Sequence, residues 1–248
     1  MVDPREDLAV EATEEQRRAA YEARWQVGGF ALLGAYGDLL ADPQANATAA
    51  EFVREKIRGI VEDPELAEKL APKSFPIGTK RVCVDTGYYA TFNRDNVSLV
   101  DLREEPIEAI TPAGVRTSAR EYAADAIVYA IGFDAMTGAL ARIDIRGRGG
   151  RALTDAWSAG PRTYLGLMVA GFPNLFTVTG PGSPSVLTNM IESIQQHVEW
   201  IGRCVDDLAA AGCTTIEPTT EAQDGWVDYV NSVAGFTLFP TCNSWYLG

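Results

Sequence analysis

The sequence predicts an α/β fold, and three features support that prediction. Short β segments separated by turns occupy residues 98–117, and a continuous apolar run covers residues 126–131. Such a run is typical of a strand that is buried on both faces. A long amphipathic helix follows, because apolar residues recur at alternating intervals of four and three and therefore share one helix face. These residues are Leu187, Ile191, Ile194, Val198, Ile201, Val205 and Leu208.

The first part of the chain is predicted to be helical. The pairs Thr13/Gln16 and Thr48/Glu51 each have the spacing of a capping box, in which two side chains satisfy the first free N–H groups of a helix. Each pair therefore predicts a helix start. An Asp-Pro pair predicts a third, short helix over residues 63–70.

The middle of the chain has the sequence pattern of a β-meander. Turn signals separate three short segments, 98–101, 107–110 and 115–117, which we expect to be strands. Two further strand candidates, 164–169 and 175–179, come later and are split by another turn.

A glycine-rich turn, Gly180-Pro181-Gly182, joins the last strand candidate to the long helix. Ser183 is the expected N-cap, Pro184 suits the first helical position, and Gly212 is the expected stop. Such a unit presents free backbone N–H groups to an acceptor-rich ligand. The same pattern also fits a βα unit that only packs a core. One more helix is expected near 225–233.

Composition excludes several function classes. The net charge of −13 argues against non-specific binding to nucleic acid or to an anionic membrane surface. No apolar run approaches the roughly 20 residues that span a bilayer. The acidic first residues do not resemble a signal peptide, so we expect a cytoplasmic protein.

Reactive side chains are sparse. His197 is the one histidine, and its place inside the long helix favours a structural or solvent-facing role over catalysis or metal binding. The chain contains no G-x-S-x-G, Walker A or G-x-G-x-x-G motif, and no metal site is expected. Four scattered cysteines form no C-x-x-C pair and are expected to be buried free thiols: Cys83, Cys204, Cys213 and Cys242.

Taken together, seven segments resemble the flavin-dependent Baeyer–Villiger monooxygenases, enzymes that insert oxygen beside a ketone. The glycine-rich turn is more similar to the phenylacetone and steroid monooxygenase branch than to the cyclohexanone branch. The segments follow the family's order over nearly the whole chain: 78–81, 88–97, 130–135, 143–147, 157–166, 180–190 and 244–246.

The departures from the family pattern concern its glycine motifs. The family's two G-x-G-x-x-G motifs, for FAD and NADP, and its fingerprint F-x-G-x-x-x-H-x-x-x-W are absent, and Ile131 stands where the family has threonine. The chain therefore looks like the second half of such an enzyme. The resemblance implies a partial flavoprotein: a helical insertion at 1–76, half of the NADP-binding domain at 77–133, and most of the second half of the FAD-binding domain at 134–248. The missing N-terminal half of the same enzyme is the expected partner.

The resemblance also implies the reaction. The intact enzyme would use FAD and NADPH to insert one atom of O₂ beside the carbonyl of a small ketone, through a peroxide formed on the flavin. Arg81 matches the catalytic residue: a permanent cation would keep that peroxide deprotonated and stabilise the oxyanion of the addition intermediate. Lys80 matches the residue that pairs with the 2′-phosphate of NADP, and Arg81 is expected at the same cofactor.

Further site residues follow from the same matches. Trp245 corresponds to an aromatic residue beside the nicotinamide ribose of NADP. Met190 corresponds to a residue whose backbone meets the pyrimidine ring of FAD. Ser185, Val186 and Leu187 correspond to a bulge that shapes the ketone pocket.

Two other functions remain open at this point. The first is a flavin monooxygenase that oxygenates nitrogen or sulfur, and the second is a non-catalytic interaction module. Loss of ketone oxidation with survival of sulfide oxidation on replacing Arg81 separates the first from the ketone enzyme. We further expect the chain alone to bind FAD weakly or not at all, because the glycine turn for the pyrophosphate is missing.

Overall fold

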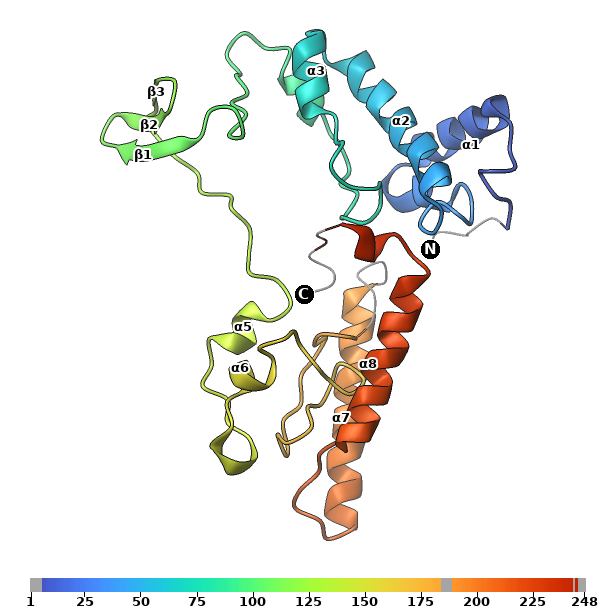
Figure 1. The fold of residues 1–248 in the computed structure, drawn as a ribbon, viewed down its shortest axis with the longest axis vertical. Helices are drawn as coiled ribbons and strands as arrows, with labels where there is room; N and C mark the ends of the chain where they lie inside the picture. The colour runs from blue at the N-terminus through green and yellow to red at the C-terminus, as the bar shows by residue number, and fades with distance from the viewer. Residues whose placement is uncertain (1–5, 184–188, 243, 245–248) are drawn as a thin grey trace. The chain divides into compact units, whose positions relative to one another are not determined.

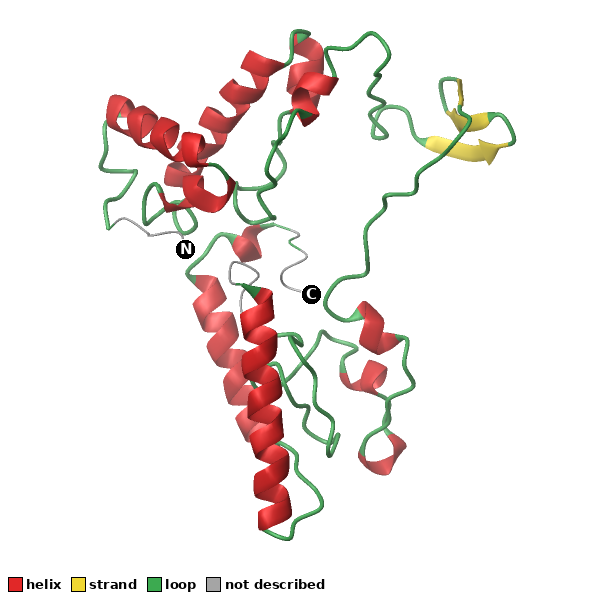
Figure 2. Ribbon diagram, turned by 180° about the vertical axis from the view of Figure 1, so that it is seen from behind, coloured by secondary structure: helices red, strands yellow, loops and turns green. Residues whose placement is uncertain are grey.

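The structure is a computed structural model that describes residues 6–183, 189–242 and 244 (Figure 1). It divides into two compact units, Met1–Gly132 and Phe133–Gly248. Helices and one small sheet make up the regular structure of the described residues, so the chain is mixed α/β (Figure 2). The finer division at residue 76 stays a prediction.

The first unit begins with helices whose ends follow the local sequence. The capping box of Thr13 and Gln16 is present, as predicted. The start predicted at Thr48 is wrong, because Asp42 caps the helix six residues earlier and Thr48 donates its hydroxyl proton to the carbonyl of Ala45 inside it. The elements are α1 (Glu14–Val27), a 3₁₀ turn η1 (Gly29–Gly34), α2 (Pro43–Ile60), α3 (Pro64–Leu70), as predicted, and α4 (Tyr88–Thr91).

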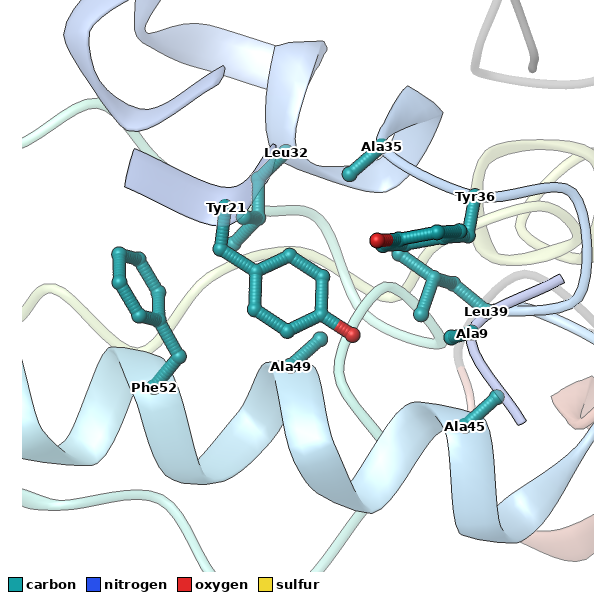
Figure 3. Packing of buried hydrophobic residues seen from close by; sticks show 9 residues of the cluster. All are labelled: Ala9, Tyr21, Leu32, Ala35, Tyr36, Leu39, Ala45, Ala49 and Phe52. Atoms are coloured by element: carbon teal, nitrogen blue, oxygen red, sulfur yellow. The ribbon is translucent and has the colours of Figure 1, made fainter. Parts of the chain in front are cut away.

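Aromatic packing holds α1, α2 and the segment that follows η1 together (Figure 3). The ring of Tyr21 lies 5.5 Å from that of Phe52 and 5.8 Å from that of Tyr36, and its hydroxyl bonds Thr48 at 2.6 Å. Burial raises the pKa of Tyr21, so it stays a neutral phenol. Alanines at positions 45 and 49 let the partner elements approach α2 closely.

The predicted β-meander is present. Three antiparallel strands, β1 (Ile107–Thr111), β2 (Gly114–Thr117) and β3 (Glu121–Ala123), pair in the order β1-β2-β3. The first of the three expected strands, 98–101, is wrong: the segment is irregular and pairs with no described strand. The third observed strand, β3, was not predicted.

The strand predicted at 126–131 is also wrong for the described chain. The segment has no strand partner, and the exposed fractions of Val128 and Ile131 are 85% and 90%. Phe133 directly after it is fully exposed. Burial on both faces needs neighbouring strands and covering helices, which the described residues do not supply here.

The second unit is built on a small apolar core with long stretches of irregular backbone. The two strands predicted at 164–169 and 175–179 are wrong: Tyr164 and Met168 form only an isolated bridge, and no described strand pairs with either segment. The core consists of Leu153, Trp157, Val169 and Phe172. The elements are α5 (Gly138–Ala141), η2 (Arg148–Gly150), α6 (Leu153–Ala156), α7 (Met190–Ala210), α8 (Thr220–Gly235), which contains the expected last helix, and η3 (Phe239–Thr241).

The long helix α7 starts later than predicted. Asn189 is its N-cap, whereas Ser183 lies in a turn and donates its N–H to the carbonyl of Gly180. Pro184 lies outside the described residues. The predicted stop is confirmed: Gly212 has φ +65° and closes the helix, and the N–H groups of Gly212 and Cys213 bond the carbonyls of the last turn.

The apolar stripe of α7 does not face the core of the described unit. Ile191 is 71% exposed and Val198 53%, while the buried residues of the helix are Ser193 and His197. The expected burial of the cysteines is also wrong, since Cys83 is exposed and the other three are exposed or half-buried; all four are free thiols.

Candidate functional site

A tight turn sets the position of the two predicted basic residues. The backbone N–H and hydroxyl of Thr79 both bond the carbonyl of Pro76, at 3.2 and 2.7 Å, and Thr79 is fully buried. Gly78 in this turn has φ +88°, a conformation that favours glycine. Lys80 and Arg81 follow directly, so the turn fixes the direction in which the chain leaves it.

A buried asparagine ties this turn to α2. The side-chain amide of Asn46 donates to the carbonyls of Leu39 and Ile77, at 2.8 and 2.9 Å, and accepts from the N–H of Ile77 at 3.0 Å. Only 3% of Asn46 is exposed. Sequence analysis missed this residue, because nothing in the alanine-rich start of α2 indicates its distant partner Ile77.

The basic pair lies at a cavity of about 530 Å³ within the first unit. The ammonium of Lys80 is 4.9 Å from the ring centre of Phe75, and the guanidinium of Arg81 is 4.7 Å from that of Phe30. The quadrupole of each ring attracts the cation that lies over its face. Arg24 and Arg54 also line the cavity.

The rest of the cavity lining is mainly apolar and contains a single acidic side chain, that of Asp85. Trp25, Phe75 and Tyr89 supply aromatic surface. Burial raises the pKa of Tyr89, so its phenol is neutral and adds no charge. A cationic cavity with aromatic walls suits an anionic ligand with a planar body, which is the chemistry of a phosphate-bearing nucleotide.

The glycine-rich turn of the second unit is held by side chains from distant segments. Thr163 donates its hydroxyl proton to the carbonyl of Pro181 at 2.6 Å, and the indole N–H of Trp226 bonds the carbonyl of Gly182 at 3.1 Å. His197 accepts the N–H of Thr179 on its Nδ1 at 3.1 Å and is 7% exposed, which confirms a structural role.

Met190 is the first residue of α7. The side chain of Asn189 accepts the N–H of Ile191 at 3.1 Å. Within the described residues, the backbone N–H groups of Met190 and Glu192 have no hydrogen-bond partner. Free N–H groups at the positive end of a 21-residue helix can bind a carbonyl or an anionic oxygen.

The structure does not describe the remaining predicted site residues. Ser185, Val186, Leu187 and Trp245 lie outside the described residues. In the described ranges, no group of three or more metal-ligating side chains occurs, and no helix there is long and apolar enough to cross a membrane.

The chain is similar over nearly its whole length to proteins of known activity. No family model matches it. A solved structure titled oxidized steroid monooxygenase bound to NADP is 51% identical, with a TM-score of 0.91 over 99% of this chain and 47% of its own. A complex of OTEMO with FAD and NADP is 43% identical, with a TM-score of 0.92 over 98% of this chain and 46% of its own.

A curated relative agrees with the solved structures. The 2-oxo-Δ³-4,5,5-trimethylcyclopentenylacetyl-CoA monooxygenase of Pseudomonas putida is 44% identical over 99% of this chain. The chain belongs to the Baeyer–Villiger monooxygenase family. It spans about half the length of the relatives it matches, 45% in the case of the P. putida enzyme. The resemblance found from the sequence motifs is therefore confirmed.

Proposed function

We propose that the protein containing this chain is an FAD- and NADPH-dependent monooxygenase that inserts one oxygen atom of O₂ beside the carbonyl of a small ketone. The observation that carries the proposal is the Lys80–Arg81 pair at a cationic, aromatic-walled cavity. By the resemblance, these two residues match the family's basic residues. Most of the chain would form the second halves of an NADP-binding and an FAD-binding domain.

The residues of the cavity fit an NADP molecule. Lys80 offers a compact point charge for the 2′-phosphate, and Arg81 offers a planar fork of donors. The cavity walls can take a planar ring beside these charges, since Trp25 and Phe75 line them. Trp245 is proposed to pack beside the nicotinamide ribose, by resemblance alone.

The start of α7 fits one edge of a flavin. The free N–H of Met190 can donate to a pyrimidine-ring carbonyl, and the positive helix end favours an electron-rich oxygen. Ser185, Val186 and Leu187, which precede the helix, are proposed to shape the ketone pocket. The chain has no glycine motif for the pyrophosphate of either cofactor, so these residues would bind only part of each.

The catalytic contribution of this chain is electrostatic. When bound, FAD and NADPH supply the electrons and activate the oxygen. The guanidinium of Arg81 is a cation with a planar fork of donors, so it would stabilise anionic oxygen in the reacting groups. Donors fixed in a site of low dielectric are worth far more than in water, and removing one typically costs about 10²–10³ in rate. The Asn46 clamp and the Thr79 turn hold the backbone from which Arg81 projects.

The missing half of the enzyme is proposed to cover the exposed apolar surfaces. Ile131, Phe133 and Ile191 are 90%, 100% and 71% exposed. Large apolar side chains left this exposed are candidates for contact with another part of the protein.

The test is a chimeric enzyme. The chain replaces the equivalent part of the 51% identical steroid monooxygenase, and the product of an NADPH-dependent reaction with a small ketone is analysed by mass spectrometry. Formation of an ester or lactone that carries one atom from labelled O₂ supports the proposal. NADPH oxidation that yields only hydrogen peroxide, in a chimera that is folded and binds flavin, contradicts it.

A further inference from the structure

A second recess, of about 280 Å³, lies within the second unit. Ala156 of α6, Trp157 and Val169 form its apolar wall, and Arg151 and Gln223 contribute polar groups. It shares no lining residue with the cavity around Arg81, so an inference drawn from it does not depend on the proposed monooxygenase activity.

Gln223 provides the observation that points to a ligand. It is 7% exposed, and its Oε1 accepts the backbone N–H of Ala170 at 2.9 Å. Because a backbone N–H can only donate, the oxygen must face Ala170, and this assignment leaves the NH₂ group of Gln223 as a donor. Within the described chain that NH₂ group has no acceptor, although Gln223 lines the recess. The NH₂ group can therefore donate to an acceptor on a molecule bound in the recess.

The charges around the recess favour an anionic acceptor. The guanidinium of Arg151 forms no ion pair with any described residue, whereas that of Arg162 is paired with Asp224 at 2.6 Å. Thr220, the first residue of the 16-residue helix α8, also lines the recess. The positive end of a helix dipole therefore adds to the charge of Arg151.

We propose that this recess binds a small carboxylate that carries a compact apolar group. The carboxylate would accept hydrogen bonds from the NH₂ of Gln223 and from Arg151, whose planar fork matches its two oxygens. The apolar group would pack against Trp157 and Val169, which are almost fully buried. Inorganic phosphate has the charge but no apolar part, and a neutral amide has the shape but no charge.

The test is calorimetric titration of the 248-residue chain with benzoate. Gln223→Glu keeps an oxygen that can accept the N–H of Ala170. It replaces the NH₂ donor by a negatively charged acceptor of nearly the same shape. Arg151→Gln removes the cation. Arg203→Gln is the matched control, because Arg203 is an exposed arginine of α7 that does not line the recess. Circular dichroism verifies that each variant keeps its helices.

We expect saturable one-to-one binding of benzoate. The affinity should fall about tenfold or more in Gln223→Glu and in Arg151→Gln, the effect of losing one hydrogen bond to a charged group. Arg203→Gln should leave the affinity within about twofold, and benzamide and phosphate should each bind about tenfold or more weakly than benzoate. Absence of saturable binding, or equal binding by the wild type and both recess variants, would overturn the proposal. Phosphate binding as tight as that of benzoate would overturn it too.

Discussion

Replacing Asn46 tests whether a buried amide holds the backbone before Arg81. Asn46→Ala removes three hydrogen bonds and leaves one N–H and two carbonyls of the Leu39 and Ile77 backbone without that partner. With a net contribution of about 0.5–1.5 kcal/mol for each bond, the loss of unfolding free energy should be about 2–4 kcal/mol. Little water can replace the amide, because the site is 3% exposed.

Asn93→Ala is the matched control. Asn93 is exposed and makes two bonds of the same kind, to the N–H of Glu62 at 3.0 Å and the carbonyl of Ile60 at 2.7 Å. Water can take over both bonds, so the loss should stay below about 1 kcal/mol. The assay is urea unfolding followed by circular dichroism. The free energies of unfolding of the two variants are compared with the same dependence on urea concentration (the m-value).

A third variant, Asn46→Asp, makes the stability depend on pH in a predictable direction. The introduced carboxyl faces two carbonyl oxygens in a buried site, so its folded pKa is raised above its unfolded value. The variant should therefore be most stable below the unfolded pKa of about 3.9 and lose stability as the pH rises. Equal losses in Asn46→Ala and Asn93→Ala, or an Asn46→Asp stability that does not fall with rising pH relative to wild type, would refute the reasoning.

Three further predictions concern the turn, the acid range and the flavin. Gly78→Ala should lower the free energy of unfolding by about 1–3 kcal/mol, because φ is +88° and the new methyl would lie 2.5 Å from a side-chain carbon of Leu40. Gly87→Ala is the control: φ is +96° there, but nothing lies within 4 Å of the new methyl, so the loss should be smaller in the same urea assay. The hydrogen bond from Arg58 lowers the pKa of Glu68 to about 2, so the Arg58–Glu68 pair stabilises the fold above the ordinary pKa of 4.5 and its contribution is lost as the pH falls from 4.5 towards 2. Glu68→Gln should accordingly flatten the fall in stability over that range, and an unchanged acid profile would contradict the assignment. The isolated chain should leave gel filtration without a stoichiometric yellow flavin, as absorbance measures; a retained equimolar flavin would show that the half-sites suffice.

Local sequence signals predicted the ends of several helices correctly. Thr13 and Gly212 act through neighbours a few residues away, so the pattern contains the whole cause of each cap. Thr48 shows the limit of this approach. The helix already begins at the stronger Asp42–Pro43 signal, so Thr48 and Glu51 lie inside it instead of at its start.

Burial was harder to predict than helix ends. The apolar run at 126–131 and the stripe of α7 have the composition of buried elements, yet Ile131 and Ile191 are exposed in the described chain. Periodicity identifies which face is apolar, but it does not say what covers that face. What covers a face is decided by segments that are distant in the sequence, and the chain spans 45% of the length of the P. putida relative.

The candidate site came from resemblance rather than from pattern. A Lys-Arg pair in a loop has no diagnostic spacing, and the cavity beside it became visible only in the structure. The Asn46 clamp could not be predicted at all, because its partner Ile77 is 31 residues away in the sequence.

The most direct test of the central claim is the ratio of two activities in the chimeric enzyme. Arg81→Ala, Arg81→Lys and, as control, Arg94→Ala, which changes an exposed arginine outside the cavity, are compared for oxidation of a ketone and of a sulfide. We predict that Arg81→Ala lowers ketone oxidation by about 10²-fold or more while sulfide oxidation and flavin content persist, that Arg81→Lys restores part of the loss, and that Arg94→Ala changes neither rate. Ketone oxidation that survives Arg81→Ala within about tenfold would contradict the role assigned to this guanidinium.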